Sequence, residues 1–217
     1  MNVNPIQLPE IGALRRRCIA LAMLDAIICP EWEYRYFSFN AHWSAGEEMA
    51  SMRNGQGDEW FLLFGEAGAA LKGFAHESPV PSADFAKEVQ NSVPGEFGSF
   101  LQEPAFSMES ATFCYWRRAQ DNLWSLVSLK TAEHSNADDG STDLLSLLVA
   151  SSSAYEDFSN DYFERKISRE VINAIYEHAP LTAMIVAYLN PEIEMKVVAE
   201  MAKEIGYPCE DSPETGG

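Results

Sequence analysis

A strand–turn–strand pattern between residues 47 and 75 constrains the fold of this chain more than any other sequence feature. Segments 48–53, 60–64 and 69–74 have strand length, and glycine-bearing turn sequences separate them. Connections this short join antiparallel neighbours, because parallel strands need a long crossover. The pattern therefore predicts an antiparallel meander.

Two further regions are expected to extend this sheet. Residues 31–39 are rich in aromatic side chains that alternate with charges at the start of the segment, which is typical of a strand with one solvated face. Residues 111–118 and 123–129 flank a four-residue loop and predict a second hairpin. The sheet should then have about six strands.

Helical patterns lie on both sides of the strand region. Apolar residues recur at helical spacing between Ile11 and Ile28, and helical patterns dominate from Leu144 to Ile205, with shorter helices expected at 82–91 and 95–102. The predicted fold class is α+β, an antiparallel sheet covered by N-terminal and C-terminal helices. Residues 1–207 are expected to form a single domain, with an internal division near 131–142 as the alternative. Residues 208–217 are expected to be a flexible tail.

Acidic residues outnumber basic ones strongly. The 217 residues include 33 Asp and Glu against 15 Lys and Arg, a formal net charge of -18, yet 47% of the residues are hydrophobic. Such a chain can bury a core, so the excess acid must lie on the surface. A negative field repels phosphate backbones and anionic lipids and attracts cationic surfaces, so we expect neither nucleic-acid nor membrane binding. Solubility alone is the competing explanation.

The cysteines and the N-terminal region favour a cytoplasmic protein. The four cysteines have no C-x-x-C spacing, which favours free thiols in a reducing compartment. Three arginines precede an apolar stretch in the manner of a secretory signal, but Asp25 interrupts that stretch. We therefore interpret it as a helix of the folded domain.

Motifs for common chemistries are missing from the sequence. It contains no phosphate-binding loop, no G-x-S-x-G or H-E-x-x-H motif, and no His and Cys cluster with metal spacing. We expect no catalytic residues, no metal and no cofactor, and the sequence favours a protein that is not an enzyme.

One group of residues supports an alternative function. Arg53, Asn54 and Asp58 surround a glycine-bearing turn, and His76 and Glu77 directly follow the segment 69–74. A histidine beside a carboxylate can act as a general base. These residues predict a ligand site on the meander loops, in a small-molecule-binding protein or a hydrolase-like enzyme.

The segment 131–164 is the most acidic part of the chain. It contains eight acids and no Lys or Arg, and three aromatic residues lie at helical spacing near its end. Aromatic anchors beside carboxylates suit a cationic protein partner. The predicted partner-binding residues are Asp138, Asp139, Asp143, Tyr155, Glu156, Asp157, Phe158, Asp161 and Tyr162. Two alternatives are an ordinary amphipathic helix whose aromatic side chains enter the core, and a homo-oligomer that uses this helix as its interface.

Four stretches of the sequence resemble parts of uncharacterised bacterial proteins of similar length. The stretches are Glu31–Tyr36, Ser51–Asp58, Lys72–Ser78 and Glu204–Pro208. The resemblance implies a bacterial origin and a single-domain form. In general character the chain is also similar to immunity proteins of toxin systems, including the SMI1/KNR4-like group, although that group's motif is absent. The leading hypothesis is a non-enzymatic acidic binding protein of the immunity type, which neutralises a basic protein partner such as a nuclease toxin.

Overall fold

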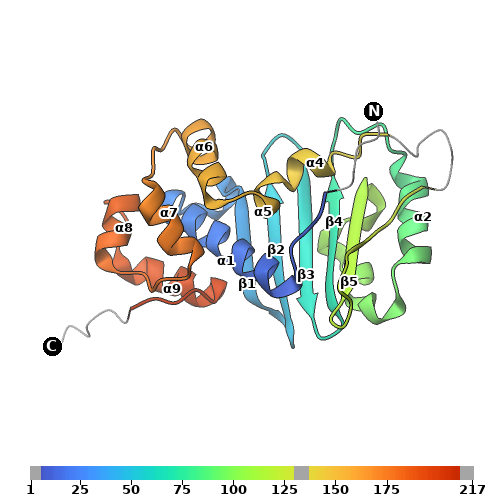
Figure 1. Cartoon of the computed structure of the whole chain (residues 1–217), viewed down its shortest axis with the longest axis horizontal. Coiled ribbons are helices and arrows are strands. Elements are labelled where there is room, and N and C mark those ends of the chain that lie inside the picture. The colour runs from blue at the N-terminus through green and yellow to red at the C-terminus, as the bar shows by residue number, and fades with distance from the viewer. Residues whose placement is uncertain (1–5, 130–136, 211–217) are drawn as a thin grey trace.

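The computed structural model describes residues 6–129 and 137–210, and it contains one antiparallel sheet with six strands in chain order. The strands are β1 (Phe37–Ser44), β2 (Glu47–Arg53), β3 (Glu59–Gly65), β4 (Gly68–Phe74), β5 (Phe113–Arg118) and β6 (Ser125–Leu126). Each strand pairs with the one before it (Figure 1). The predicted antiparallel sheet and the α+β class are confirmed.

Both faces of the central strands are buried. In β3, Trp60, Leu62 and Phe64 belong to one hydrophobic cluster, while Phe61 and Leu63 belong to another on the opposite face. Successive side chains of a strand point to opposite faces, so a continuous apolar run requires cover on both sides. The fold therefore has helices on each face of the sheet.

The first face carries α1 and all the C-terminal helices. These are α1 (Ile11–Ile28), α4 (Ser141–Leu144), α5 (Ser146–Val149), α6 (Ser152–Tyr162), α7 (Arg169–Tyr176), α8 (Ala183–Leu189) and α9 (Met195–Ile205). Helix α1 packs against β1, α7 and α9, and its side chains from Cys18 to Ile28 are all buried. In Figure 1, α6 to α9 gather on the β1 side of the molecule.

The second face is covered by the chain between β4 and β5. This segment contains α2 (Ser82–Ser92), α3 (Gly98–Gln102) and three single 3₁₀ turns, η2 (Gly95–Phe97), η3 (Pro104–Phe106) and η4 (Met108–Ser110). Phe85, Val89, Phe100 and Phe106 fill the second cluster. The sheet is thus covered by its middle helices as well as by those at the two ends of the chain.

The expected strand at 31–39 is only partly correct. Its first half forms the 3₁₀ turn η1 (Trp32–Tyr34), and β1 begins at Phe37. Arg35 donates to the carbonyl oxygens of Cys29 and Pro30, at 3.0 and 2.5 Å, which folds this segment back onto the end of α1. The strand can begin only after that turn.

The expected tail at 208–217 and the expected linker at 131–142 lie partly outside the described residues. Leu181 pairs with Cys209 in an isolated bridge, so the ordered contacts extend into the expected tail at 208–217. Residues 211–217, and residues 130–136 of the expected linker at 131–142, lie outside the described part of the chain. Across 6–129 and 137–210, no helix combines the length and the apolar character needed to span a bilayer.

Candidate functional site

The turn before β3 and the segment after β4 meet at one end of the sheet. Antiparallel pairing places Glu59 beside Phe74, so the residues that flank this pair, Asp58 and Ala75–His76, come together. Oδ1 of Asp58 lies 2.7 Å from Nδ1 of His76 and also accepts the backbone N–H of His76 at 2.8 Å. One carboxylate oxygen therefore fixes both the ring and the backbone of His76.

Asn54 holds Asp58 in place from the other side of the turn. Its Nδ2 donates to Oδ2 of Asp58 at 2.6 Å, and its Oδ1 accepts the backbone N–H groups of Gln56 and Asp58 at 2.8 and 3.1 Å. An Asn side chain that bonds the backbone two residues ahead is a recurrent turn device. The carboxylate is consequently preorganised before any ligand binds.

The contact between Asp58 and His76 shifts the pKa values of both groups. Partial burial disfavours the charged form of Asp58, but the hydrogen bonds from His76 and Asn54 outweigh it and lower the pKa of Asp58. The hydrogen bond to Asp58 raises the pKa of His76 above its ordinary value, and the charge of Glu77 adds to this effect. Asp58 is therefore ionised at neutral pH, and His76 holds a proton more readily than a free histidine does.

A third segment, residues 138–144, closes the site. The Ser78 hydroxyl donates to the Asp138 carbonyl at 2.8 Å, and the Trp60 indole N–H donates to the Leu144 carbonyl at 3.0 Å. Gly140 has φ 81° and packs directly on Ala75, where an added Cβ would lie 2.3 Å from the Ala75 Cβ. The close approach is possible only because Gly140 lacks a side chain.

These three segments form an open cleft of about 270 Å³. Its lining residues are Asp58, Ala75, His76, Glu77, Ser78, Pro79, Asp138, Gly140, Asp143 and Leu144. We call it the acidic cleft, because it contains four carboxylates and no Lys or Arg among the described residues that line it. The Glu77 side chain is 90% exposed and that of His76 is 42% exposed, so both can reach a ligand.

The residues of the predicted ligand site separate into two places. Asp58, His76 and Glu77 line the acidic cleft, and Asn54 supports it. The Arg53 guanidinium instead lies over the rings of Trp32 and Phe61, at 5.1 and 5.4 Å from their centroids. It belongs to the face of the sheet that α2 and α3 cover, because Phe61 packs in that cluster.

The predicted partner-binding acids are divided as well. Asp138 and Asp143 line the acidic cleft. Asp139 is half-buried and its Oδ1 accepts the Ser141 N–H at 2.8 Å, with burial raising its pKa. On α6, Glu156 pairs with Arg169 at 3.0 Å, while Asp157 and Asp161 are exposed.

The aromatic residues of α6 pack mainly inward. Tyr155 is fully buried and donates its hydroxyl to Asp25 at 2.6 Å, so it belongs to the core and not to a surface that a partner can touch. Phe158 is half-buried and packs between Tyr36 and Tyr162, with ring centroids 4.8 and 5.3 Å away. Only Tyr162, at 40% exposure, offers a sizeable ring to solvent from this helix.

The sequence did not predict that Asp138 and Asp143 would lie in the same cleft as His76. About sixty residues separate these groups, and the contacts that join them run through Ser78, Trp60 and Thr112. These three contacts join residues that are far apart in the chain, so no local residue pattern predicts them. Cys114 is buried, and burial raises the pKa of its thiol, so it cannot supply a nucleophile to a hydrolase-like site.

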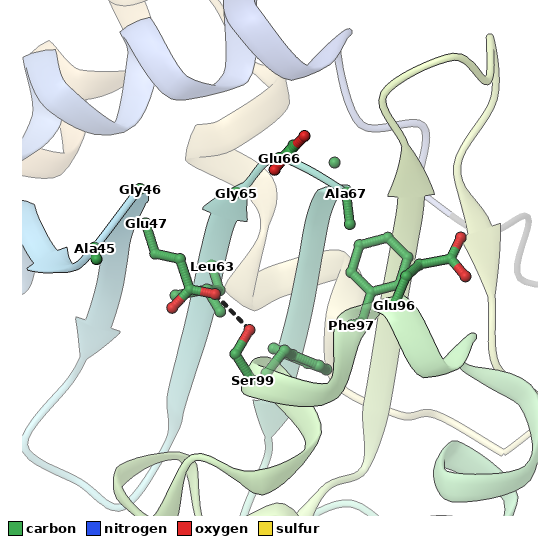
Figure 2. Close-up of a pocket in the computed structure, with 12 residues that line it drawn as sticks. Ala45, Gly46, Glu47, Leu63, Gly65, Glu66, Ala67, Glu96, Phe97 and Ser99 are labelled. Atoms are coloured by element: carbon green, nitrogen blue, oxygen red, sulfur yellow. Dashed lines mark hydrogen bonds between the residues drawn. The ribbon is translucent and has the colours of Figure 1, made fainter.

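A second cleft of about 250 Å³ lies at the opposite end of the sheet, between the hairpin turns and α3. Figure 2 shows the Glu47 carboxylate turned toward the Ser99 hydroxyl, with which it is hydrogen-bonded, and the Glu96 carboxylate directed away from that contact. Glu47 also accepts from Ser44, and Glu96 is paired with Arg118. These acids are already satisfied, so we interpret this cleft as a packing junction.

In comparisons with protein-family models, with curated proteins and with solved structures, nothing matches this chain. Within the described residues, no group of three or more His, Cys, Asp or Glu side chains is arranged to hold a metal ion. The geometry of the acidic cleft is therefore the main guide to function.

Proposed function

We propose that this protein is a non-enzymatic binding protein that recognises a cationic protein partner at the acidic cleft. One observation carries the proposal. Four carboxylates from three separate segments, Asp58, Glu77, Asp138 and Asp143, line one open cleft, and no Lys or Arg is among its described lining residues. His76 is already paired with Asp58, so the charges of Glu77, Asp138 and Asp143 are the ones left for a partner to neutralise.

The cleft suits a basic side chain. A concave surface lined by charges of one sign focuses the field and attracts the opposite charge. The net charge of -18 adds a long-range attraction in the same direction. The exposed Glu77 and Asp143 would receive an inserted Lys or Arg, and the exposed Asp138 would steer its approach.

The finer proposal concerns the partner. A nuclease binds nucleic acid through a cationic surface, and an acidic protein can occupy that surface in place of phosphate. In this role the protein would be an immunity-type neutraliser of a basic toxin. Its carboxylates would then compete directly with the nucleic-acid substrate.

Affinity purification of the tagged full chain from its host, followed by measurement of association rates with the recovered protein, tests this proposal. We expect a basic partner whose association slows as ionic strength rises, because salt screens exposed charges beyond about 10 Å. A nuclease partner should lose activity in proportion to bound complex. A neutral or acidic partner, or association independent of salt, would contradict the proposal.

A second function has its own supporting observation. Asp58 orients His76 through Nδ1 and leaves Nε2 3.9 Å from Glu77, which is how a general base would be held. A small-molecule site or hydrolase-like activity at the same cleft would use this pair. His76→Gln separates the two functions, because turnover would be lost entirely whereas protein recognition would weaken only a few-fold.

Thermal-shift screening of small cations provides the direct test of this second function. A true ligand stabilises the fold in proportion to the logarithm of its concentration over its dissociation constant. Stabilisation that disappears in His76→Gln supports the small-molecule site.

A further inference from the structure

An aromatic cleft lies on the face of the sheet that α2 and α3 cover, beside the edge strand β1. Its volume is about 250 Å³, and rings of Trp32, Trp43 and Phe61 line it together with Arg53 and Glu204. Polar groups of Ser38, Asn40 and Ser51 also border it. It shares no residue with the acidic cleft.

Arg53 is the cation of this cleft, and its hydrogen-bonding edge is free for a ligand. The guanidinium lies over Trp32 and Phe61, and its cross-strand neighbour Glu59 is committed to Lys72 at 3.1 Å. Among residues 6–129 and 137–210, no acceptor bonds the Arg53 side chain. Stacking on rings leaves the planar fork of an Arg available for bidentate binding of a carboxylate.

The walls of the cleft are rigid aromatic surfaces. The Phe61 and Phe106 rings stack with centroids 5.0 Å apart, and the Trp43 and Phe106 rings stack at 6.2 Å. Trp32 also lines the cleft and is 56% exposed. An exposed indole beside a free guanidinium, over a fixed aromatic floor, has the composition of a preformed ligand pocket.

We propose that this cleft binds a small aromatic monocarboxylate. The ring of the ligand would pack on Trp32 and Trp43, and its carboxylate would form two hydrogen bonds with Arg53. The cleft is slightly smaller than the roughly 300–1,000 Å³ of drug-sized sites, so it suits a ligand with one or two rings.

Charge favours a single carboxylate over a phosphate or a dicarboxylate. The protein has a net charge of -18, and Glu204 borders the same cleft. A second negative charge on the ligand would meet Glu204, and among the described residues that line the cleft no Lys or Arg other than Arg53 could pair with it. A monoanion needs only Arg53.

Calorimetric titration of the full chain with benzoate and indole-3-carboxylate tests this site, with the indole N–H signals of Trp32 and Trp43 followed by NMR. We expect saturable binding and shifts of both indole signals. Arg53→Gln should weaken binding about 10- to 100-fold, the usual cost of losing a charge-assisted hydrogen-bonded pair of roughly 1.5–3 kcal/mol.

Arg118→Gln is the matched control, because Arg118 also lies over an indole, that of Trp116 at 5.2 Å, but is paired with Glu96. This variant should bind as the wild type does, and the neutral benzamide should bind much more weakly than benzoate. Absence of saturable binding, equal binding of benzamide, or undiminished binding by a folded Arg53→Gln variant would overturn the proposal. None of these results bears on the acidic cleft.

Discussion

Asp25 is a completely buried acid, and its burial disfavours the ionised form of the carboxyl group. Its Oδ1 accepts the Tyr155 hydroxyl at 2.6 Å and its Oδ2 accepts the Phe37 N–H at 2.7 Å, so the carboxyl group joins α1, β1 and α6. Complete burial raises the pKa of Asp25 from 3.8 to about 7, although both hydrogen bonds act in the opposite direction. The same residue that interrupts the apolar stretch of the sequence thus organises the first core.

Asp25 makes stability depend on pH in a defined direction. Between pH 3.8 and about 7 the folded state holds a proton that the unfolded state releases. The free energy of unfolding should therefore fall as pH rises through this window, by at most roughly 1.4 kcal/mol per pH unit, and become level above it. Urea unfolding of wild type and Asp25→Asn from pH 5 to 8 checks this, since the variant should lack that part of the slope. The exposed Asp157→Asn serves as control and should keep it.

Lys72 is the second buried charge. Its ammonium is fully buried on the α2 face, 3.1 Å from both Oε1 of Glu59 and Oγ of Ser110, and burial lowers the pKa of Lys72. The Glu59 side chain keeps 26% exposure. Removing either partner leaves the other charge behind, but only Glu59 can then be hydrated.

The two partners should consequently differ in their effect on stability. We expect Glu59→Gln to lower the free energy of unfolding by about 2–4 kcal/mol, because it strands a buried ammonium, and Lys72→Met to cost less. Chemical denaturation of both variants provides the measurement. A larger loss for Lys72→Met would contradict this explanation of the pair.

At the scale of elements, β4 and β5 fit together because Gly73 leaves room for a ring. Gly73 pairs with Phe113, and a Cβ built on Gly73 would lie 1.8 Å from the Phe113 ring. Phe113 is fully buried in the first cluster and cannot swing into solvent. The β4–β5 pair therefore depends on a small residue at this position.

Gly73→Ala should destabilise the fold by roughly 1–3 kcal/mol through overpacking. Gly95→Ala is the matched control, since its Cβ would meet no atom within 4 Å and Gly95 has no positive φ. Thermal unfolding of both variants measures the difference. Equal melting temperatures would show that the β4–β5 interface can relax around the extra methyl group.

The sequence predicted elements where local patterns decide them. The meander, the buried helix from Ile11 to Ile28 and the hairpin at 111–129 follow from turn residues and apolar periodicity, and the structure contains them. The start of β1 could not be predicted, because hydrogen bonds from Arg35 to the end of α1 override the strand propensity of residues 32–36. Apolar residues on both faces of β3 require a second helical layer, which α2 and α3 provide. The prediction of a sheet covered by N-terminal and C-terminal helices did not include this layer.

At the scale of the whole molecule, four carboxylates meet at the acidic cleft, where residues 138–144 return to the sheet. The pairing of Asp58 with His76 joins two turns that the sequence could place near one another, because they flank adjacent strands. Asp138 and Asp143 arrive from a distant segment held by side-chain hydrogen bonds, which no local pattern reveals. Half of the candidate site could thus be predicted. The aromatic cleft at Arg53 could not, because its lining residues come from six separate elements, η1, β1, β2, β3, η3 and α9.

The most direct test of the acidic cleft compares two variants of equal charge. Glu77→Gln/Asp143→Asn neutralises two acids that line the cleft, and Asp157→Asn/Asp161→Asn neutralises two exposed acids on α6. Binding of a lysine-rich peptide, measured by calorimetry at low salt, should weaken about 3- to 10-fold in the first variant, as expected for losing two partly exposed charge contacts. The second variant should stay within about twofold of the wild type, a difference near 0.4 kcal/mol. Equal weakening by both variants would show that net charge alone attracts the peptide, and would contradict recognition at the acidic cleft.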